Sequence, residues 1–176
     1  MIAVSEIAEI FLGPGDYHFG GENTRIVTVL GSCISIAAWH PSMRIGGMCH
    51  YVLPDGEAGQ KGAFDGRYAD TAMNWLLREM HRCGTSPRGY RIHVFGGSCM
   101  FAYGGSSPAA AVGARNIEAA RALLNHHGFP PAAADVGGAS SRRVVFDFWS
   151  GRIEVVKSQA TAVMATQGSS QARGYE

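Results

Sequence analysis

The chain has 176 residues, 46% of them hydrophobic and 16% charged, and this length is typical of one domain with a substantial core. Its formal net charge of +1 gives no field that would attract nucleic acid or anionic lipid, so neither partner is expected. Apolar stretches such as residues 34–39 are far shorter than the ~18–20 residues that cross a bilayer, which argues against membrane insertion.

Short strands punctuated by glycine are predicted in the first third of the chain. Their segments are alternating or continuously apolar, and they cover residues 8–12, 25–29, 33–39 and 45–52. We expect these strands to follow one another as a meander. A polar, glycine-rich loop is predicted after them, up to about residue 66.

Two helices and four further strands are predicted in the rest of the chain. Apolar residues at helical spacing predict one helix from Ala69 that ends near Gly84 and a second helix over residues 114–127. Residues 98–112, rich in Ser, Ala and Gly, are predicted to form a long loop. The strands are predicted at residues 90–95, 134–136, 142–149 and 152–157.

This pattern predicts a single α+β domain in which strands outnumber helices. The domain is expected to cover residues 1–157. From Ser158 to Glu176 the sequence has no periodicity, so we expect a flexible C-terminal tail.

The most informative residues are Cys33, in the turn-like segment 30–33 (LGSC), and His50 further along the chain. An imidazole near a thiol can withdraw its proton and return it to a leaving group, which is the minimum chemistry for acyl transfer from an amide. Gly31 and Ser32 permit a tight turn that exposes the sulfur and aims main-chain N–H groups at an oxyanion. The alternative, a cysteine that only fills the core, stays open on spacing alone.

The four cysteines fit a reducing compartment, and the first residues lack the basic and apolar segments of a secretory signal. We therefore expect free thiols and a cytoplasmic protein. A metal site is not expected, because Cys49 and His50 point to opposite faces of a strand and no Cys-x-x-Cys or His-x-x-x-His pair occurs. Cys49 is then expected to be structural.

Two segments around the candidate pair, 28–33 (TVLGSC) and 46–54 (GGMCHYVLP), resemble the CheD family of chemoreceptor glutamine deamidases. The likeness spans about residues 5–157 and continues in order at 68–73 (YADTAM), 94–97 (VFGG), 113–116 (GARN), 135–138 (DVGG) and 142–146 (RRVVF). The resemblance implies a mixed β-sandwich with helices packed on the outside, and makes residues 1–157 a CheD-like catalytic domain.

The resemblance also implies an activity: hydrolysis of glutamine side-chain amides on methyl-accepting chemotaxis receptors to glutamate and ammonia. Cys33 matches the family nucleophile, which forms a thioester, and His50 matches its general base, so no metal or organic cofactor is needed. A family threonine orients the histidine. Thr28 precedes Cys33 by five residues while Val27 occupies the sixth position, and strand alternation decides whether Thr28 faces the histidine.

Two other functions stay open on the sequence. One is a noncatalytic chemotaxis adaptor that binds receptors or the phosphatase CheC, a partner that the resemblance implies. The other is a receptor glutamate methylesterase, because one thioester intermediate serves both esters and amides. Arg142 and Arg143 are candidates for holding an acidic partner surface.

Overall fold

The computed structural model of the chain describes residues 6–55, 65–99, 108–130 and 132–158. The expected tail lies outside these residues, apart from Ser158. In the described part of the chain, no helix has both the length and the apolar character needed to cross a membrane. The elements in chain order are β1 (Ala8–Leu12), β2 (Tyr17–Gly20), β3 (Thr24–Leu30), β4 (Ile34–His40), β5 (Ile45–Tyr51), α1 (Ala69–Arg82), a 3₁₀ turn (Pro87–Gly89), β6 (Arg91–Gly96), α2 (Pro108–His126), β7 (Ala133–Val136), β8 (Arg142–Asp147) and β9 (Arg152–Lys157).

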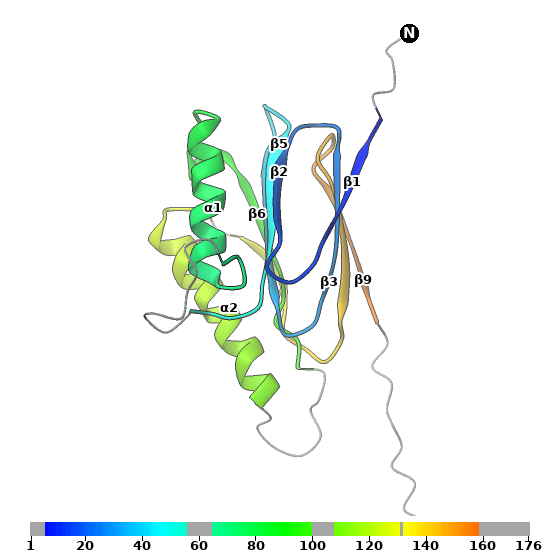
Figure 1. Cartoon of the computed structure of the whole chain (residues 1–176), viewed down its shortest axis with the longest axis vertical. Helices are drawn as coiled ribbons and strands as arrows, with labels where there is room; N and C mark the ends of the chain where they lie inside the picture. The colour runs from blue at the N-terminus through cyan, green and yellow to red at the C-terminus, as the bar shows by residue number, and fades with distance from the viewer. Residues whose placement is uncertain (1–5, 56–64, 100–107, 131, 159–176) are drawn as a thin grey trace, which may run out of the picture.

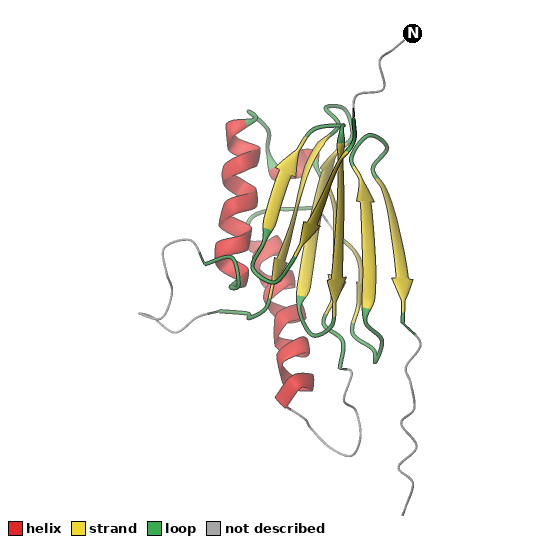
Figure 2. Ribbon diagram, turned by 45° about the vertical axis from the view of Figure 1, so that its right-hand side comes forward, coloured by secondary structure: helices red, strands yellow, loops and turns green. Residues whose placement is uncertain are grey.

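Two sheets face each other, and both helices lie on the outer side of one of them (Figures 1 and 2). The four-stranded sheet has the order β1-β3-β8-β9, and the five-stranded sheet, which carries the helices, has the order β2-β5-β4-β6-β7. Both sheets mix parallel and antiparallel pairs, since β1 is parallel to β3 and β6 is parallel to β7. The α+β fold, a mixed β-sandwich with helices packed on the outside, is confirmed.

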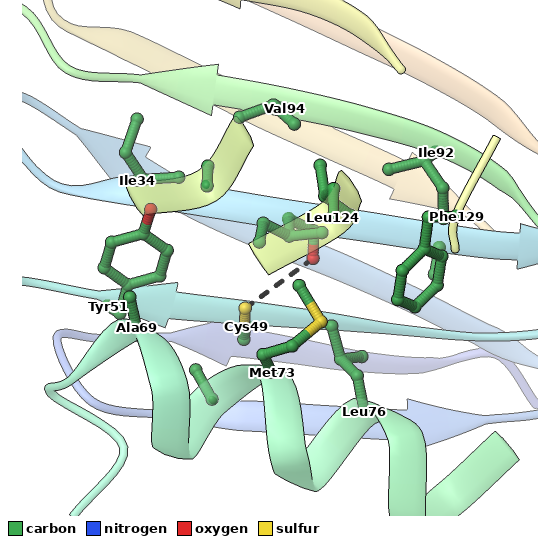
Figure 3. Packing of buried hydrophobic residues seen from close by; sticks show 14 of the residues in the cluster. Ile34, Cys49, Tyr51, Ala69, Met73, Leu76, Ile92, Val94, Leu124 and Phe129 are labelled. Atoms are coloured by element: carbon green, nitrogen blue, oxygen red, sulfur yellow. Dashed lines mark hydrogen bonds between the residues drawn. The ribbon is translucent and has the colours of Figure 1, made fainter. Parts of the chain in front are cut away.

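The central strand β4 is covered on both faces, which explains its continuous apolar sequence. Ile34 and Ile36 pack in the core between the five-stranded sheet and the helices, whereas Ala37 and Trp39 pack between the two sheets. The neighbouring strand β5 divides in the same way, with Cys49 on the helix side beside Met73 of α1 (Figure 3). In both β4 and β5, therefore, one face packs in the core beneath the helices and the other packs in the core between the two sheets.

The predicted meander is wrong. Strand β1 pairs in parallel with β3 in one sheet, while β2, which was not predicted, pairs with β5 in the other. The chain therefore passes from one sheet to the other between β1 and β2 and returns at β3. The pairing of these strands depends on distant residues, so the local alternation of apolar residues does not predict it.

Helix α2 begins at Pro108, within the predicted loop 98–112. Proline suits the first turn of a helix, and the alanines that follow it favour helix. Gly113 has a low helix propensity, so the sequence does not predict that this segment is helical. Gly113 has a packing reason: a Cβ built on it would lie 2.7 Å from the carbonyl oxygen of Gly97. The helix can approach the end of β6 this closely only because it presents a glycine there.

Gly96 brings the end of β6 against the turn before β4. Its φ is +108°, and a Cβ built on it would lie 2.1 Å from the carbonyl oxygen of Cys33. Both the backbone conformation and the close approach therefore require glycine.

Gly96→Ala should lower the free energy of unfolding by about 2–4 kcal/mol, because a strained φ and an overlap with Cys33 act together. Gly84→Ala is the matched control: Gly84 also has a positive φ, of +67°, but nothing lies within 4 Å of its added Cβ. It should cost only about 1–2 kcal/mol. Urea denaturation measures both, and equal losses would contradict the close approach at Gly96.

Candidate active site

Cys33 lies in the bend between β3 and β4, where the backbone is held from behind. Each of three successive carbonyl groups accepts one hydrogen bond from a neighbouring element. The donors are Ser98 N to Gly31 O at 2.8 Å, Asn116 Nδ2 to Ser32 O at 3.0 Å and Gly97 N to Cys33 O at 2.8 Å. The turn of residues 31–33, here called the nucleophile turn, is therefore anchored by the end of β6 and by α2.

This anchoring also directs the N–H groups of the nucleophile turn. In a trans peptide unit, the N–H group points opposite to the preceding carbonyl. Since the Gly31 and Ser32 carbonyls face β6 and α2, the N–H groups of Ser32 and Cys33 face away from them. Among the described residues, neither N–H group donates to a backbone carbonyl. The N–H groups of Ser32 and Cys33 thus stay candidates for the oxyanion donors that the sequence predicts.

Strand register brings Cys33 and His50 to the same face of the five-stranded sheet. His50 on β5 is directly opposite Ser35 on β4, and Cys33 lies two residues before Ser35. Such a diagonal pair typically has Cα atoms about 7–8 Å apart, which longer side chains span. Half-buried Cys33 packs against the core between the sheets, and His50 is 2% exposed.

The His50 ring is held on its Nδ1 side by the adjacent strands β1 and β3 of the four-stranded sheet. Nδ1 lies 3.0 Å from Thr28 Oγ1 and 3.4 Å from the carbonyl oxygen of Leu12. The Thr28 hydroxyl donates its one hydrogen to the Leu12 carbonyl at 2.8 Å, so toward the imidazole its oxygen accepts. We therefore assign the hydrogen of neutral His50 to Nδ1.

The other ring nitrogen, Nε2, is left with a lone pair. It is buried and has no hydrogen-bond partner among the described residues. An unpartnered buried acceptor is costly, and a catalytic role is one of the reasons for which proteins keep such a group. Nε2 is the nitrogen of neutral His50 that can accept a proton.

The register of β3 resolves the position of the threonine. Ile26 and Leu30 pack between the sheets, and Thr28, which alternates with them, points the same way. Val27, at the sixth position before Cys33, occupies the opposite phase of the strand. The hydroxyl therefore reaches the imidazole from the fifth position.

Burial determines the resting protonation of the pair. It raises the pKa of the Cys33 thiol, partly offset by the residue's own backbone N–H group, and it lowers the pKa of His50, partly offset by the Leu12 carbonyl and Asp16. Both shifts favour the neutral forms. Burial therefore favours an uncharged thiol and an uncharged imidazole in the free protein.

Cys49 and Arg142 belong to the supporting structure. Cys49 is buried on the helix side of β5, and burial raises its pKa to about 12. The Arg142 side chain is 3% exposed and pairs with Asp135, so its expected contact with a partner is wrong. It donates to the Ser98 hydroxyl, the residue whose backbone holds Gly31. Arg143 is exposed on the same strand.

The contact of Asn116 with the site was not predicted from the sequence. Asn116 is fully buried on α2, and Ala120 and Leu124 continue the same face at intervals of four residues. A polar residue in phase with a buried helix face is the signal that would have indicated it.

A thiol and a buried imidazole lie on one face of a helix-covered sandwich, with a hydroxyl behind the imidazole, and this is the set of side chains that thiol hydrolases use. The comparisons with known proteins are specific. A family model described as CheD chemotactic sensory transduction matches residues 52–157. The chain belongs to the CheD family.

Relatives in several bacteria are similar over most of their length. A protein of Dechloromonas aromatica with the name "Probable chemoreceptor glutamine deamidase CheD 3" is 42% identical over 151 residues, which cover 86% of this chain and 88% of that one. Proteins of the same CheD name from Pseudomonas savastanoi and Chromobacterium violaceum are 43% and 41% identical, and each match covers 85% of this chain and 84% and 78% of theirs. A solved structure, YlmD from Geobacillus stearothermophilus, aligns with a TM-score of 0.44 and 16% identity over 77% of this chain and 61% of that one, too remote to inform function.

Alkylation of Cys33 by iodoacetamide should follow the resting protonation of the pair. Because only the thiolate reacts, the Cys33 rate should rise about tenfold for each unit of pH from 6 to 8, with no plateau at low pH. Peptide mass mapping separates Cys33 from the other three cysteines. A rate independent of pH across this range would mean that an ion pair is already formed, and would contradict the assignment.

Proposed function

We propose that this protein hydrolyses glutamine side-chain amides of methyl-accepting chemotaxis receptors to glutamate and ammonia, with Cys33 as nucleophile, His50 as general base and Thr28 as the orienting residue. The observation that carries the proposal is the buried, unpartnered Nε2 of His50 on the same sheet face as Cys33. The names of the relatives, chemoreceptor glutamine deamidases, supply the substrate class.

The first half of the reaction forms the thioester. His50 Nε2 takes the proton of Cys33 as the sulfur attacks the amide carbon of the glutamine side chain. The carbonyl oxygen becomes an oxyanion, which the N–H groups of Ser32 and Cys33 stabilise by roughly 3 kcal/mol per donor. The imidazolium then protonates the amide nitrogen, the C–N bond breaks and ammonia leaves.

The second half restores the enzyme. His50 takes a proton from water, the resulting hydroxide attacks the thioester carbon, and the C–S bond breaks. The sulfur recovers its proton from the imidazolium, and the side chain leaves as glutamate. Each turnover consumes one water and one amide and needs no metal or organic cofactor.

The environment of His50 suits both halves. Its lowered pKa keeps the ring neutral, and so able to accept a proton, at pH values where an ordinary histidine is already protonated. The same shift makes the imidazolium a stronger acid toward the leaving nitrogen. The Thr28 oxygen and the Leu12 carbonyl retain the Nδ1 hydrogen throughout, so that Nε2 performs both transfers.

We place this reaction in the cytoplasm, as the sequence predicts, and pairing with CheC stays a prediction from the family resemblance. A methylesterase would use the same thioester and differs only in the bond that is cleaved. A noncatalytic adaptor would bind receptors without converting them. The products of one assay therefore separate the three functions.

Purified protein incubated with receptor cytoplasmic fragments should convert specific glutamines to glutamate, followed by peptide mass. Cys33→Ala should lower the rate by at least about 1000-fold and His50→Ala by about 100-fold or more. Cys83→Ser, which removes an exposed cysteine, is the matched control and should keep the wild-type rate. Conversion that survives Cys33→Ala would defeat the proposal. Binding without conversion by the wild type would favour the adaptor, and loss of methyl ester alone would favour the esterase.

Thr28→Val should lower kcat about 10- to 100-fold, because it removes the acceptor behind Nδ1 while the side-chain volume is kept. Thr28→Ser keeps the hydroxyl and should retain most of the activity. Steady-state deamidation kinetics measure both variants. If Val and Ser behave alike, the hydroxyl does not orient the base.

A further inference from the structure

Asn116 joins the turn that carries the proposed nucleophile to the residue just after β5, the strand that carries the proposed base. Its side-chain nitrogen donates to Ser32 O at 3.0 Å and to Val52 O at 2.8 Å. Ser32 immediately precedes Cys33, and Val52 follows His50 by two residues. One amide group therefore spans from the nucleophile turn to the end of β5.

The amide orientation is unambiguous. Both contacts of Nδ2 are carbonyl oxygens, which only accept, so a flipped amide would place three acceptors together. Asn116 is 0% exposed, and its Oδ1 is buried with no partner among the described residues. Asn116 thus leaves one buried acceptor without a partner and donates two hydrogen bonds. An apolar residue of similar size would donate neither.

The backbone of Asn116 is tied to the same strand. Tyr51, the neighbour of His50 on β5, donates from its hydroxyl to the carbonyl oxygen of Asn116 at 2.6 Å. The Tyr51 ring points from β5 toward α2 in Figure 3. Helix α2 is therefore fixed to β5 by the tyrosine and fixed to the nucleophile turn by the amide.

This arrangement controls how closely the Cys33 sulfur and the His50 imidazole can approach, and the proposed reaction depends on that distance. Burial favours the protonated thiol, so proton transfer requires Cys33 Sγ and His50 Nε2 to come within hydrogen-bond reach during attack. A displacement of about 1 Å can cost roughly 100-fold in rate. The turn also has to keep the Ser32 carbonyl facing α2, since this direction sets that of the Cys33 N–H group.

We infer that Asn116 is a positioning residue of the reaction: it fixes the nucleophile turn relative to the strand of the base, and so sets both the sulfur-to-imidazole approach and the direction of an oxyanion donor. This inference rests on the proposed function. It gives Asn116 no contact with substrate and assigns its effect to kcat.

Asn116→Asp tests the inference, because it keeps the shape of the side chain and replaces the two donors with an acceptor. It should lower kcat for receptor deamidation about 10- to 100-fold and leave KM within about threefold. Asn125→Asp makes the same change at an exposed position of the same helix and should match the wild type. The pH dependence of Cys33 alkylation should change in Asn116→Asp and not in Asn125→Asp.

Tyr51→Phe is the second variant, which keeps the inference testable if Asn116→Asp does not fold. It removes only the hydroxyl that holds the Asn116 carbonyl, and it should lower kcat about three- to tenfold with KM unchanged. The inference is overturned if a folded Asn116→Asp variant keeps its kcat, if the loss lies in KM, or if the Asn116→Asp variant is unfolded and Tyr51→Phe has wild-type kcat. Activity that survives Cys33→Ala would instead defeat the proposed function, which keeps the two failures distinct.

Discussion

The arrangement of the candidate site depends on how the nucleophile turn is held. Its three carbonyl groups are bound by Ser98, Asn116 and Gly97, so the turn has one orientation although it belongs to no strand or helix. The close approach needs Gly96, and the Ser98 end is fixed by buried Arg142. The supports come from segments far apart in the chain. The fold therefore supplies a rigid cradle for a short loop, which is a common way to present a reactive side chain.

His50, the proposed base, is held in a different way from the nucleophile turn. His50 lies between two sheets at 2% exposure, a position usually occupied by apolar residues. Its ring is tolerated because one nitrogen has partners and because the neutral form carries no charge into the core. The other nitrogen has no partner among the described residues, and the proposed chemistry uses that deficit. In the proposed mechanism a thiolate and an imidazolium form in surroundings of low dielectric, where their mutual attraction is strong. The N–H groups of the turn and the Leu12 carbonyl would then help to stabilise these charges.

The sequence predicts the local part of this structure well. The bounds of strand β1 and of helix α1 follow closely from the local patterns of apolar residues, which can be read without knowing what the two elements pack against. Strand β2 and the parallel β1–β3 pair do not, because they depend on which distant strand is available. At the site, the sequence motifs indicate Cys33 and His50. The contact of Thr28 with His50 depends on which face of β3 the threonine occupies, and the contacts of Asn116 depend on how α2 packs against the sheet. Neither could be read from the sequence, because both depend on the three-dimensional arrangement of distant segments.

The burial of Cys33 also bears on how the protein withstands an oxidising environment. Peroxide attacks thiolates, and a thiol that remains protonated is oxidised slowly to sulfenic and sulfinic acids. Many cysteine enzymes keep an activated anion at rest and are inactivated by such damage. Burial raises the pKa of the Cys33 thiol, so its thiolate fraction at neutral pH is small, and we expect peroxide to oxidise it more slowly than an ordinary exposed cysteine.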